Sequence, residues 1–174
     1  MQPDNSIGYW LSYAQRCFSS AFSEVLRRHC AEQGKTYEIT PAQWGILSFL
    51  AREQEQSISA LAQRLGFDAP AVTNIVQRLE QSGLVERVRD REDQRVVKVS
   101  LSEEGQEIMR SLQPVVEGFN EQLLPGPQRQ AFIEDLQRFV ARASTLVPES
   151  AGRFGFLREH LGYGRARKAL KRKE

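Results

Sequence analysis

Two short runs of helical periodicity, separated by residues that end and start helices, constrain the fold of this chain most. The first run, SISALAQRLGF, predicts a helix over about Ser59 to Leu65 that ends at Gly66. The second run, DAPAVTNIVQRLEQSG, predicts a helix that Asp68 caps, that holds Pro70 in its first turn and that ends before Gly83. Two helices joined by so short a turn form a helix-turn-helix. The apolar residues placed to pack between them are Leu61, Ala62, Leu65, Val72, Ile75 and Leu79.

A β-hairpin is predicted directly after this motif, with strands over about Leu84 to Arg89 and Arg95 to Leu101. The second strand alternates apolar and polar residues, as a half-buried strand does. The run between the strands, from Arg89 to Arg95, holds no apolar residue and no Gly or Pro. Arginine side chains at such a tip can neutralise DNA phosphates and release counterions. The cations of this tip are Arg89, Arg91 and Arg95.

The acids of the same tip oppose a DNA contact unless they are engaged within the protein. Asp93 paired with Arg95 would brace a turn that has no glycine, and would leave Arg91 as the most exposed cation. The alternative interpretation is a solvated, charge-balanced turn that has no function.

Most of the remaining pattern is helical. Apolar residues at spacings of three and four predict one long amphipathic helix over about Ser6 to Glu32. A second helix is predicted to start at Thr40 as its cap, with Pro41 in the first turn and Gln43 completing a capping box. The N-terminal third of the chain is therefore expected to hold two helices ahead of the helix-turn-helix.

Two further helices are predicted after the hairpin. Ser102 can cap the first of them, and Pro114 falls inside it, so a kink or break is expected there. The residues at 125–127, Pro-Gly-Pro, predict a turn, and a last helix follows that stops near Pro148. The predicted fold is mainly α with one small β-hairpin.

The order of these elements, together with one segment, resembles a known family. The segment LAQRLGFDAPAVTNIVQRLEQSGLVERVRDREDQRVVKVSLSEEG resembles the MarR family of bacterial transcriptional regulators, and ITPAQWGIL resembles the family's second helix. The resemblance covers about residues 7–146 and implies a winged helix-turn-helix, with the hairpin as its wing, plus a helical dimerisation region. The family signature D-x-R-x-x-x-x-x-L-[ST]-x-x-G is matched by Asp93, Arg95, Leu101, Ser102 and Gly105.

The resemblance implies a sequence-specific DNA-binding transcriptional regulator that binds a pseudo-palindromic operator as a homodimer. A repressor released by a small-molecule effector is expected, with an activator as the alternative. The implied regions are an N-terminal dimerisation helix over 1–36, the winged helix-turn-helix over 37–101, C-terminal dimerisation helices over 102–147 and a basic extension over 148–174.

The helix that starts after Asp68 is the expected recognition helix, and its outward face suits double-stranded DNA. No acid lies between Ala69 and Leu79, as befits a surface that meets phosphates. Asn74 is the expected base reader, because a carboxamide can bond to the N6 and N7 atoms of adenine together. The residues expected to contact DNA are Pro70, Thr73, Asn74, Gln77 and Arg78 of this helix and Arg89, Arg91 and Arg95 of the wing.

Family members often take effectors in a cleft between the dimerisation region and the winged domain. A small aromatic or phenolic effector is therefore expected here. The residues predicted to line its pocket are Trp10, Tyr13, Cys17 and Trp44. Aromatic residues at helical spacing also occur in plain hydrophobic cores, which is the alternative interpretation.

The chain has two cysteines, and they show no metal-ligand spacing, so neither a metal nor another cofactor is expected. They raise redox sensing as an alternative function, since some relatives sense oxidants through a cysteine of the first helix. Cys17 lies on the apolar stripe, where a buried thiol is inert, whereas the cations at 27–29 could lower the pKa of Cys30. Structural or incidental roles are the alternative for both.

Charge is distributed unevenly along the chain. Residues 153–174 hold five Arg and three Lys against two Glu, a sum of +6, so the other residues sum to −4 if the net charge is +2. A basic tail can bind a polyanion, so a protein that coats DNA without sequence preference is a further alternative. The tail can also be solvated and bind nothing.

Other classes of protein are not expected from the sequence. No apolar run approaches the roughly 18 residues that span a bilayer, and no signal-peptide pattern opens the chain. We therefore expect a cytoplasmic protein with no membrane contact. An enzyme is not expected either, because His29 and His160 are the only histidines and neither has a triad spacing.

Overall fold

The computed structural model describes residues 5–89 and 97–146. Its helices and strands follow the predicted order, and the mainly helical fold with a small antiparallel sheet is confirmed. The predictions for Arg91, Asp93, Arg95 and the basic extension concern residues outside the described part of the chain. The elements are α1 (Ile7–Glu32), α2 (Pro41–Glu53), β1 (Gln56–Ser57), α3 (Ile58–Leu65), α4 (Ala69–Gln81), β2 (Val85–Arg89), β3 (Val97–Leu101), α5 (Glu103–Leu123) and α6 (Gly126–Thr145).

The predicted caps set the boundaries of the helices around the DNA-binding motif. The capping box of α2 is present, because Gln43 N donates to Thr40 Oγ1 over 3.3 Å and Thr40 N donates to Gln43 Oε1 over 2.8 Å. Ala71 N donates to Asp68 Oδ1 over 2.8 Å at the start of α4. Gly66 ends α3 in the left-handed conformation, with φ of 67°, which a glycine adopts without strain.

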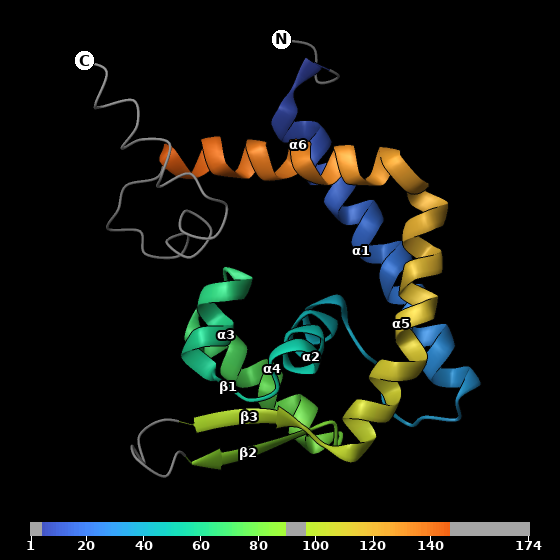
Figure 1. Ribbon diagram of the computed structural model, residues 1–174, viewed down its shortest axis with the longest axis vertical. Coiled ribbons are helices and arrows are strands. Elements are labelled where there is room, and N and C mark those ends of the chain that lie inside the picture. The colour runs from blue at the N-terminus through green and yellow to red at the C-terminus, as the bar shows by residue number, and fades with distance from the viewer. Residues whose placement is uncertain (1–4, 90–96, 147–174) are drawn as a thin grey trace.

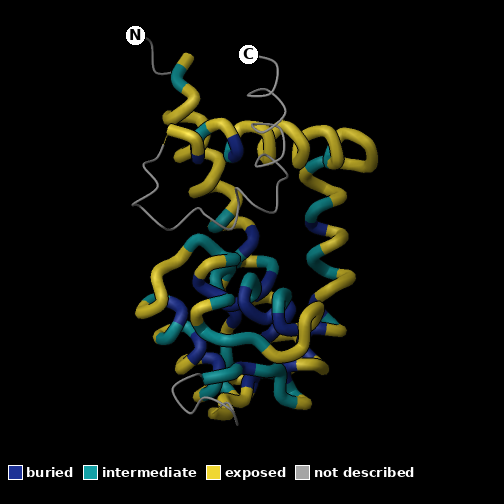
Figure 2. The backbone as a smooth tube through the Cα atoms, turned by 60° about the vertical axis from the view of Figure 1, so that its left-hand side comes forward, coloured by how far each residue is buried: buried dark blue, intermediate teal, exposed yellow. Residues whose placement is uncertain are grey.

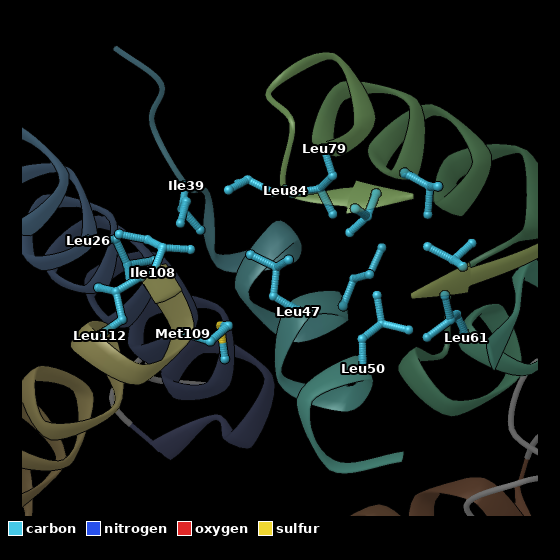
Figure 3. Close-up of a cluster of buried hydrophobic side chains, with 14 of the residues drawn as sticks. Leu26, Ile39, Leu47, Leu50, Leu61, Leu79, Leu84, Ile108, Met109 and Leu112 are labelled. Atoms are coloured by element: carbon cyan, nitrogen blue, oxygen red, sulfur yellow. The ribbon is translucent and has the colours of Figure 1, made fainter. Parts of the chain in front are cut away.

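The hydrophobic core lies mainly within the winged helix-turn-helix part of the molecule, where α2, α3 and α4 meet the sheet (Figure 3). Leu47 and Leu50 of α2 stand at its centre and are almost completely buried. The core also extends to the long helices, because Leu26 of α1 and Leu112 of α5 are fully buried. Figure 2 shows the buried residues concentrated in this half of the molecule.

The sheet has three strands in the order β1-β3-β2, all antiparallel. In the hairpin Arg87 pairs with Val99 and Arg89 pairs with Val97. The strand β1, which pairs Gln56 with Val99 from the other side, was not predicted. Two residues are too few for an alternating pattern, so only the tertiary contact with β3 reveals this strand.

The two C-terminal helices differ from their predictions in two details. Of the kink or break predicted at Pro114, the break is absent, because α5 runs from Glu103 to Leu123 with the exposed Pro114 inside it. The predicted turn at 125–127 is shorter than expected, because Gly126 and Pro127 already belong to the first turn of α6, where proline is tolerated.

The long helices leave large apolar surfaces uncovered in the single chain. In Figure 1, α5 leads away from the hairpin and α6 runs across the far end of the molecule. The exposed large apolar residues of α1 are Ile7, Tyr9, Trp10, Leu11, Tyr13 and Phe18, and those of α6 are Phe132, Ile133, Leu136 and Phe139. Among the described helices, none has the length and apolar character to cross a membrane.

The start of α5 is fastened to the turn between α4 and β2. Ser102 N donates to the carbonyl of Leu84 over 3.1 Å, and Ser102 Oγ donates to the carbonyl of Gly83 over 2.5 Å. Ser102 Oγ also accepts from Gly105 N over 3.0 Å, which caps the helix. A Cβ atom on Gly105 would overlap the carbonyl oxygen of Leu84. This joint therefore requires a glycine at the position where the family signature has one.

Replacing Gly105 by alanine is expected to lower the free energy of unfolding by about 1–3 kcal/mol or more, because α5 or the Leu84 turn must shift to make room. Urea unfolding measures the change. Gly118→Ala is the matched control, since it lies in the same helix and its Cβ would meet nothing within 4 Å. The control should gain roughly 0.5–1 kcal/mol from helix propensity. Equal stabilities of the two variants would contradict the tight joint.

Candidate nucleic-acid interface

The helix α4 has a buried face and an outward polar face, as predicted. Its inner side packs into the core through Val72, Val76 and Leu79, each fully buried. The side chains of Pro70, Asn74, Gln77 and Arg78 are exposed, and Thr73 is half-buried. The amphipathic pattern thus places the predicted contact residues together on one helix face.

Thr73 and Asn74 of this face differ in whether their side chains already form hydrogen bonds. Thr73 Oγ1 donates to the carbonyl of Ala69 over 2.8 Å, so its hydroxyl hydrogen is already used within α4. Asn74 has no side-chain hydrogen bond within the described residues. Its carboxamide therefore has both a donor and an acceptor available for a ligand.

The hairpin lies beside α4 and is linked to it by an ion pair. Arg87 Nε lies 2.7 Å from Glu80 Oε2, with 33% and 38% of the two side chains exposed. Arg89, two residues further along β2, is exposed. On the other strand, Lys98 Nζ lies 3.8 Å from Glu55 Oε1. The ion pair thus joins the polar side of α4 to the root of the hairpin.

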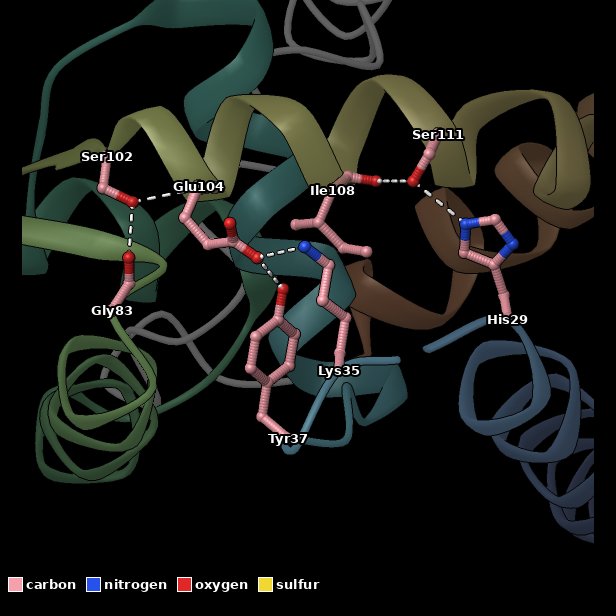
Figure 4. A network of polar contacts seen from close by, with 9 residues as sticks. His29, Lys35, Tyr37, Gly83, Ser102, Glu104, Ile108 and Ser111 are labelled. Atoms are coloured by element: carbon pink, nitrogen blue, oxygen red, sulfur yellow. Dashed lines mark hydrogen bonds and ion pairs between the residues drawn. The ribbon is translucent and has the colours of Figure 1, made fainter. Parts of the chain in front are cut away.

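A second set of polar contacts ties α5 to the segment between α1 and α2 (Figure 4). Tyr37 Oη donates to Glu104 Oε1 over 2.6 Å, and Lys35 Nζ donates to the same oxygen over 2.8 Å. The bonds from Lys35 and Tyr37 hold the pKa of the Glu104 carboxyl below its ordinary value. Burial, together with the bond to Glu104, raises the pKa of Tyr37. Both groups therefore keep the protonation states that this bond needs at neutral pH.

Deeper along α5, a buried histidine of α1 makes a further contact. Ser111 Oγ donates to the carbonyl of Ile108 over 3.0 Å and lies 2.9 Å from His29 Nε2. Ser111 Oγ therefore lies within hydrogen-bond distance of both α1 and its own helix. These contacts, which the sequence did not reveal, join the end of α1 to the helix that carries the wing.

A cavity of about 940 Å³ lies between α2, β3 and the first half of α5. Its apolar lining includes Trp44, Leu101 and Met109, and its polar lining includes Arg52 and Arg110. The buried hydroxyl of Ser48, which also lines it, has no hydrogen-bond partner within the described part of the chain. The cavity thus combines an apolar wall with two arginines and one glutamate, Glu55.

The structure does not bring the four predicted effector-pocket residues together within one chain. Trp44 lines the cavity and packs edge-on against Phe22, with ring centroids 6.2 Å apart. Trp10 and Tyr13 instead pack on each other near the start of α1, with ring centroids also 6.2 Å apart, and both are about half exposed. Neither they nor Cys17 line the cavity.

Both expectations for the cysteines are corrected. Cys17, expected to be buried, is exposed in the single chain, because the described residues do not cover its side of α1. Cys30, whose pKa the neighbouring cations were expected to lower, is buried, and burial raises the pKa of its thiol. Of groups of three or more His, Cys, Asp or Glu that could hold a metal ion, the described residues contain none.

Comparison with known proteins agrees with this geometry. Residues 37–96 match the model of the MarR family. The chain is 28% identical over 131 residues to the HTH-type transcriptional regulator SarZ of Staphylococcus epidermidis. This alignment covers 74% of this chain and 88% of SarZ. It is 29% identical over 151 residues to the homoprotocatechuate degradative operon repressor of Escherichia coli, covering 85% of this chain and 97% of that protein.

A solved structure shares most of the fold. The PcaV transcriptional regulator from Streptomyces coelicolor, solved in complex with its natural ligand, has a TM-score of 0.70 and 25% identity. The match covers 83% of this chain and 97% of PcaV. It therefore extends well beyond the DNA-binding motif. With the helix-turn-helix, the wing and the long flanking helices all in place, these comparisons support a winged helix-turn-helix transcriptional regulator of the MarR family.

Proposed function

We propose that this regulator is a repressor that binds a pseudo-palindromic operator as a homodimer and is released by a small-molecule effector. The observation that carries the proposal is the outward face of α4, which is polar, exposed and free of acids from Ala69 to Leu79. Such a face can enter the major groove without repelling phosphates. A relative that is itself named as an operon repressor supports repression over activation.

The uncovered helices support the homodimer. Exposed apolar side chains gather on α1 and α6, outside the winged domain, and a second copy can bury them about a two-fold axis. Each large apolar side chain so buried contributes roughly 1.5–3 kcal/mol. In this proposal residues 1–36 and 102–147 form the dimerisation region, 37–101 binds DNA, and 148–174 is a basic extension.

The test is selection of duplexes by the protein from a random-sequence library, followed by sedimentation of the complex. We expect selected duplexes with two inverted half-sites about one helical turn, roughly 10 bp, apart, each bound by one subunit of a dimer. A monomer on the selected duplex at micromolar concentration would contradict the dimer. Recovery of random sequence would instead favour the DNA-coating alternative.

Asn74→Ala is expected to flatten the base preference at one symmetric pair of operator positions, while binding to unrelated DNA persists. The carboxamide can read adenine with about 1–3 kcal/mol of discrimination, whereas a phosphate contact carries none. The measurement is a saturation library of operator variants bound at fixed salt. Gln81→Ala is the matched control, because Gln81 is an exposed amide at the far end of α4. An unchanged ranking of bases for Asn74→Ala would remove this residue as a reader.

The cavity beside Trp44 supports the effector part of the proposal. An aromatic or phenolic acid suits a site with an apolar wall and two arginines, which outnumber the one acid of the lining, Glu55. The occupant would lie against both α2 and α5, so it can alter how the winged domain sits on the long helices. PcaV, whose fold matches, was solved with its natural ligand bound, and another relative is named for an aromatic-degradation operon.

The chain has two tryptophans, which allows a direct test of this cavity. In a Trp10→Phe background, Trp44 is the only fluorophore of its kind, and adding homoprotocatechuate as a first probe should change its emission as DNA is released. The matched control is Trp44→Phe, which keeps Trp10 and should show a much smaller change. Release of DNA without any response of Trp44 would place the effector site elsewhere.

Redox sensing is the alternative function. The raised pKa of Cys30 argues against a role for this buried thiol, because the thiolate is the reactive form. Cys17 is exposed and so remains the candidate for this alternative. Release of DNA by an oxidant from wild type but not from Cys17→Ser would favour it over the small-molecule effector.

A further inference from the structure

The ion pair between Glu80 and Arg87 stands where α4 meets the root of the wing. Glu80 is the first acid of α4 after the acid-free stretch, and it directly follows the buried Leu79. Arg87 lies in the middle of β2, opposite Val99, and its guanidinium reaches back to α4. The pair therefore spans the line along which the recognition helix and the hairpin join.

This line faces the DNA backbone if α4 and the wing bind as proposed. A recognition helix in the major groove and a hairpin in the adjacent minor groove have one phosphate strand passing between them. Arg87 and Arg89 stand two residues apart on β2, so their side chains leave the same face of the strand. Both cations are thus directed toward the junction that this phosphate strand crosses.

We propose that Arg87 is a phosphate-binding site that Glu80 keeps partly occupied from within the protein. The carboxylate neutralises the guanidinium and competes with a backbone phosphodiester for it. About a third of each side chain is exposed, so a phosphate can reach the pair. Glu80 in this way lowers the affinity for all duplexes without changing which sequence is preferred, because a phosphate contact carries no base information.

The inference rests on the DNA-binding part of the proposed function, and it predicts the effect of neutralising Glu80. Glu80→Gln should bind both a selected operator duplex and a scrambled duplex more tightly at low salt. The slope of log affinity against log salt should become steeper by about 0.9 for each subunit bound. The ratio of the Glu80→Gln affinity to the wild-type affinity should accordingly fall about 3.5-fold per subunit as salt rises from about 50 to about 200 mM. The ranking of base variants should stay as in wild type.

A double-mutant cycle separates this role from a purely structural one. Arg87→Met should weaken binding to every duplex, because it leaves the Glu80 carboxylate unpaired beside phosphates. The double variant removes both charges and should return the salt slope to the wild-type value. If the pair only fastens the wing to α4, all three variants instead lose thermal stability and keep the wild-type slope, and the proposal is overturned.

Two reference variants complete the experiment. Glu86→Gln removes the same charge from the face of β2 opposite Arg87. Its slope of log affinity against log salt should change less than that of Glu80→Gln. Equal changes in the two slopes would show a general charge effect and overturn the proposal. Arg78→Ala probes the α4 face itself. If Arg78→Ala weakens binding while Glu80→Gln leaves the slope unchanged, only this inference fails. If neither variant has an effect, the DNA-binding face of the proposed function fails with it.

Discussion

The close approach of Gly105 to the carbonyl of Leu84 is the contact on which the arrangement of this protein depends. It sets the start of α5 directly against the turn that ends the recognition helix and begins the wing. The two hydrogen bonds of Ser102 to the same turn hold it there. Because the backbones touch without an intervening side chain, the joint has little freedom to adjust. Any movement of α5 therefore reaches both DNA-binding elements at once.

The polar contacts further along α5 extend this connection to α1. Glu104 holds Lys35 and Tyr37 of the segment before α2, and Ser111 holds His29 of α1. The cavity opens on the other side of the same stretch of α5, against α2 and β3. One length of helix thus contacts the wing, α1 and the proposed effector site. A ligand in the cavity can bias the position of α4 without contacting it, provided that it binds two arrangements of α5 unequally.

The apolar and the polar surfaces of this protein can stabilise different kinds of contact. The winged domain buries most of its apolar residues within one chain, whereas the N-terminal half of α1 and most of α6 leave theirs exposed. Hydrophobic burial is non-directional and suits association with a second copy. The face of α4 and the root of the wing instead present amides and arginines, whose contribution depends on salt and on the geometry of phosphates and base edges. In the proposed function, assembly and DNA recognition are therefore carried by different helices.

The sequence by itself determined the local elements and most of the family assignment. Capping residues such as Thr40 and Asp68, the glycine at Gly66 and the periodicity of α4 act over a few residues, so they can be recognised in the chain before it folds. The outward face that holds Asn74 followed from the same periodicity.

The tertiary structure decided every feature that joins distant segments. The pairing of β1 with β3, the ion pair of Glu80 with Arg87, the bond of Tyr37 to Glu104 and the position of the cavity have no local pattern. The exposure of Cys17 and the burial of Cys30 also depend on which helices pack against α1, whereas periodicity alone had placed Cys17 on the apolar stripe. The physical reason is range: caps and periodicity are set by neighbours in sequence, whereas burial, charge pairing and pKa are set by neighbours in space.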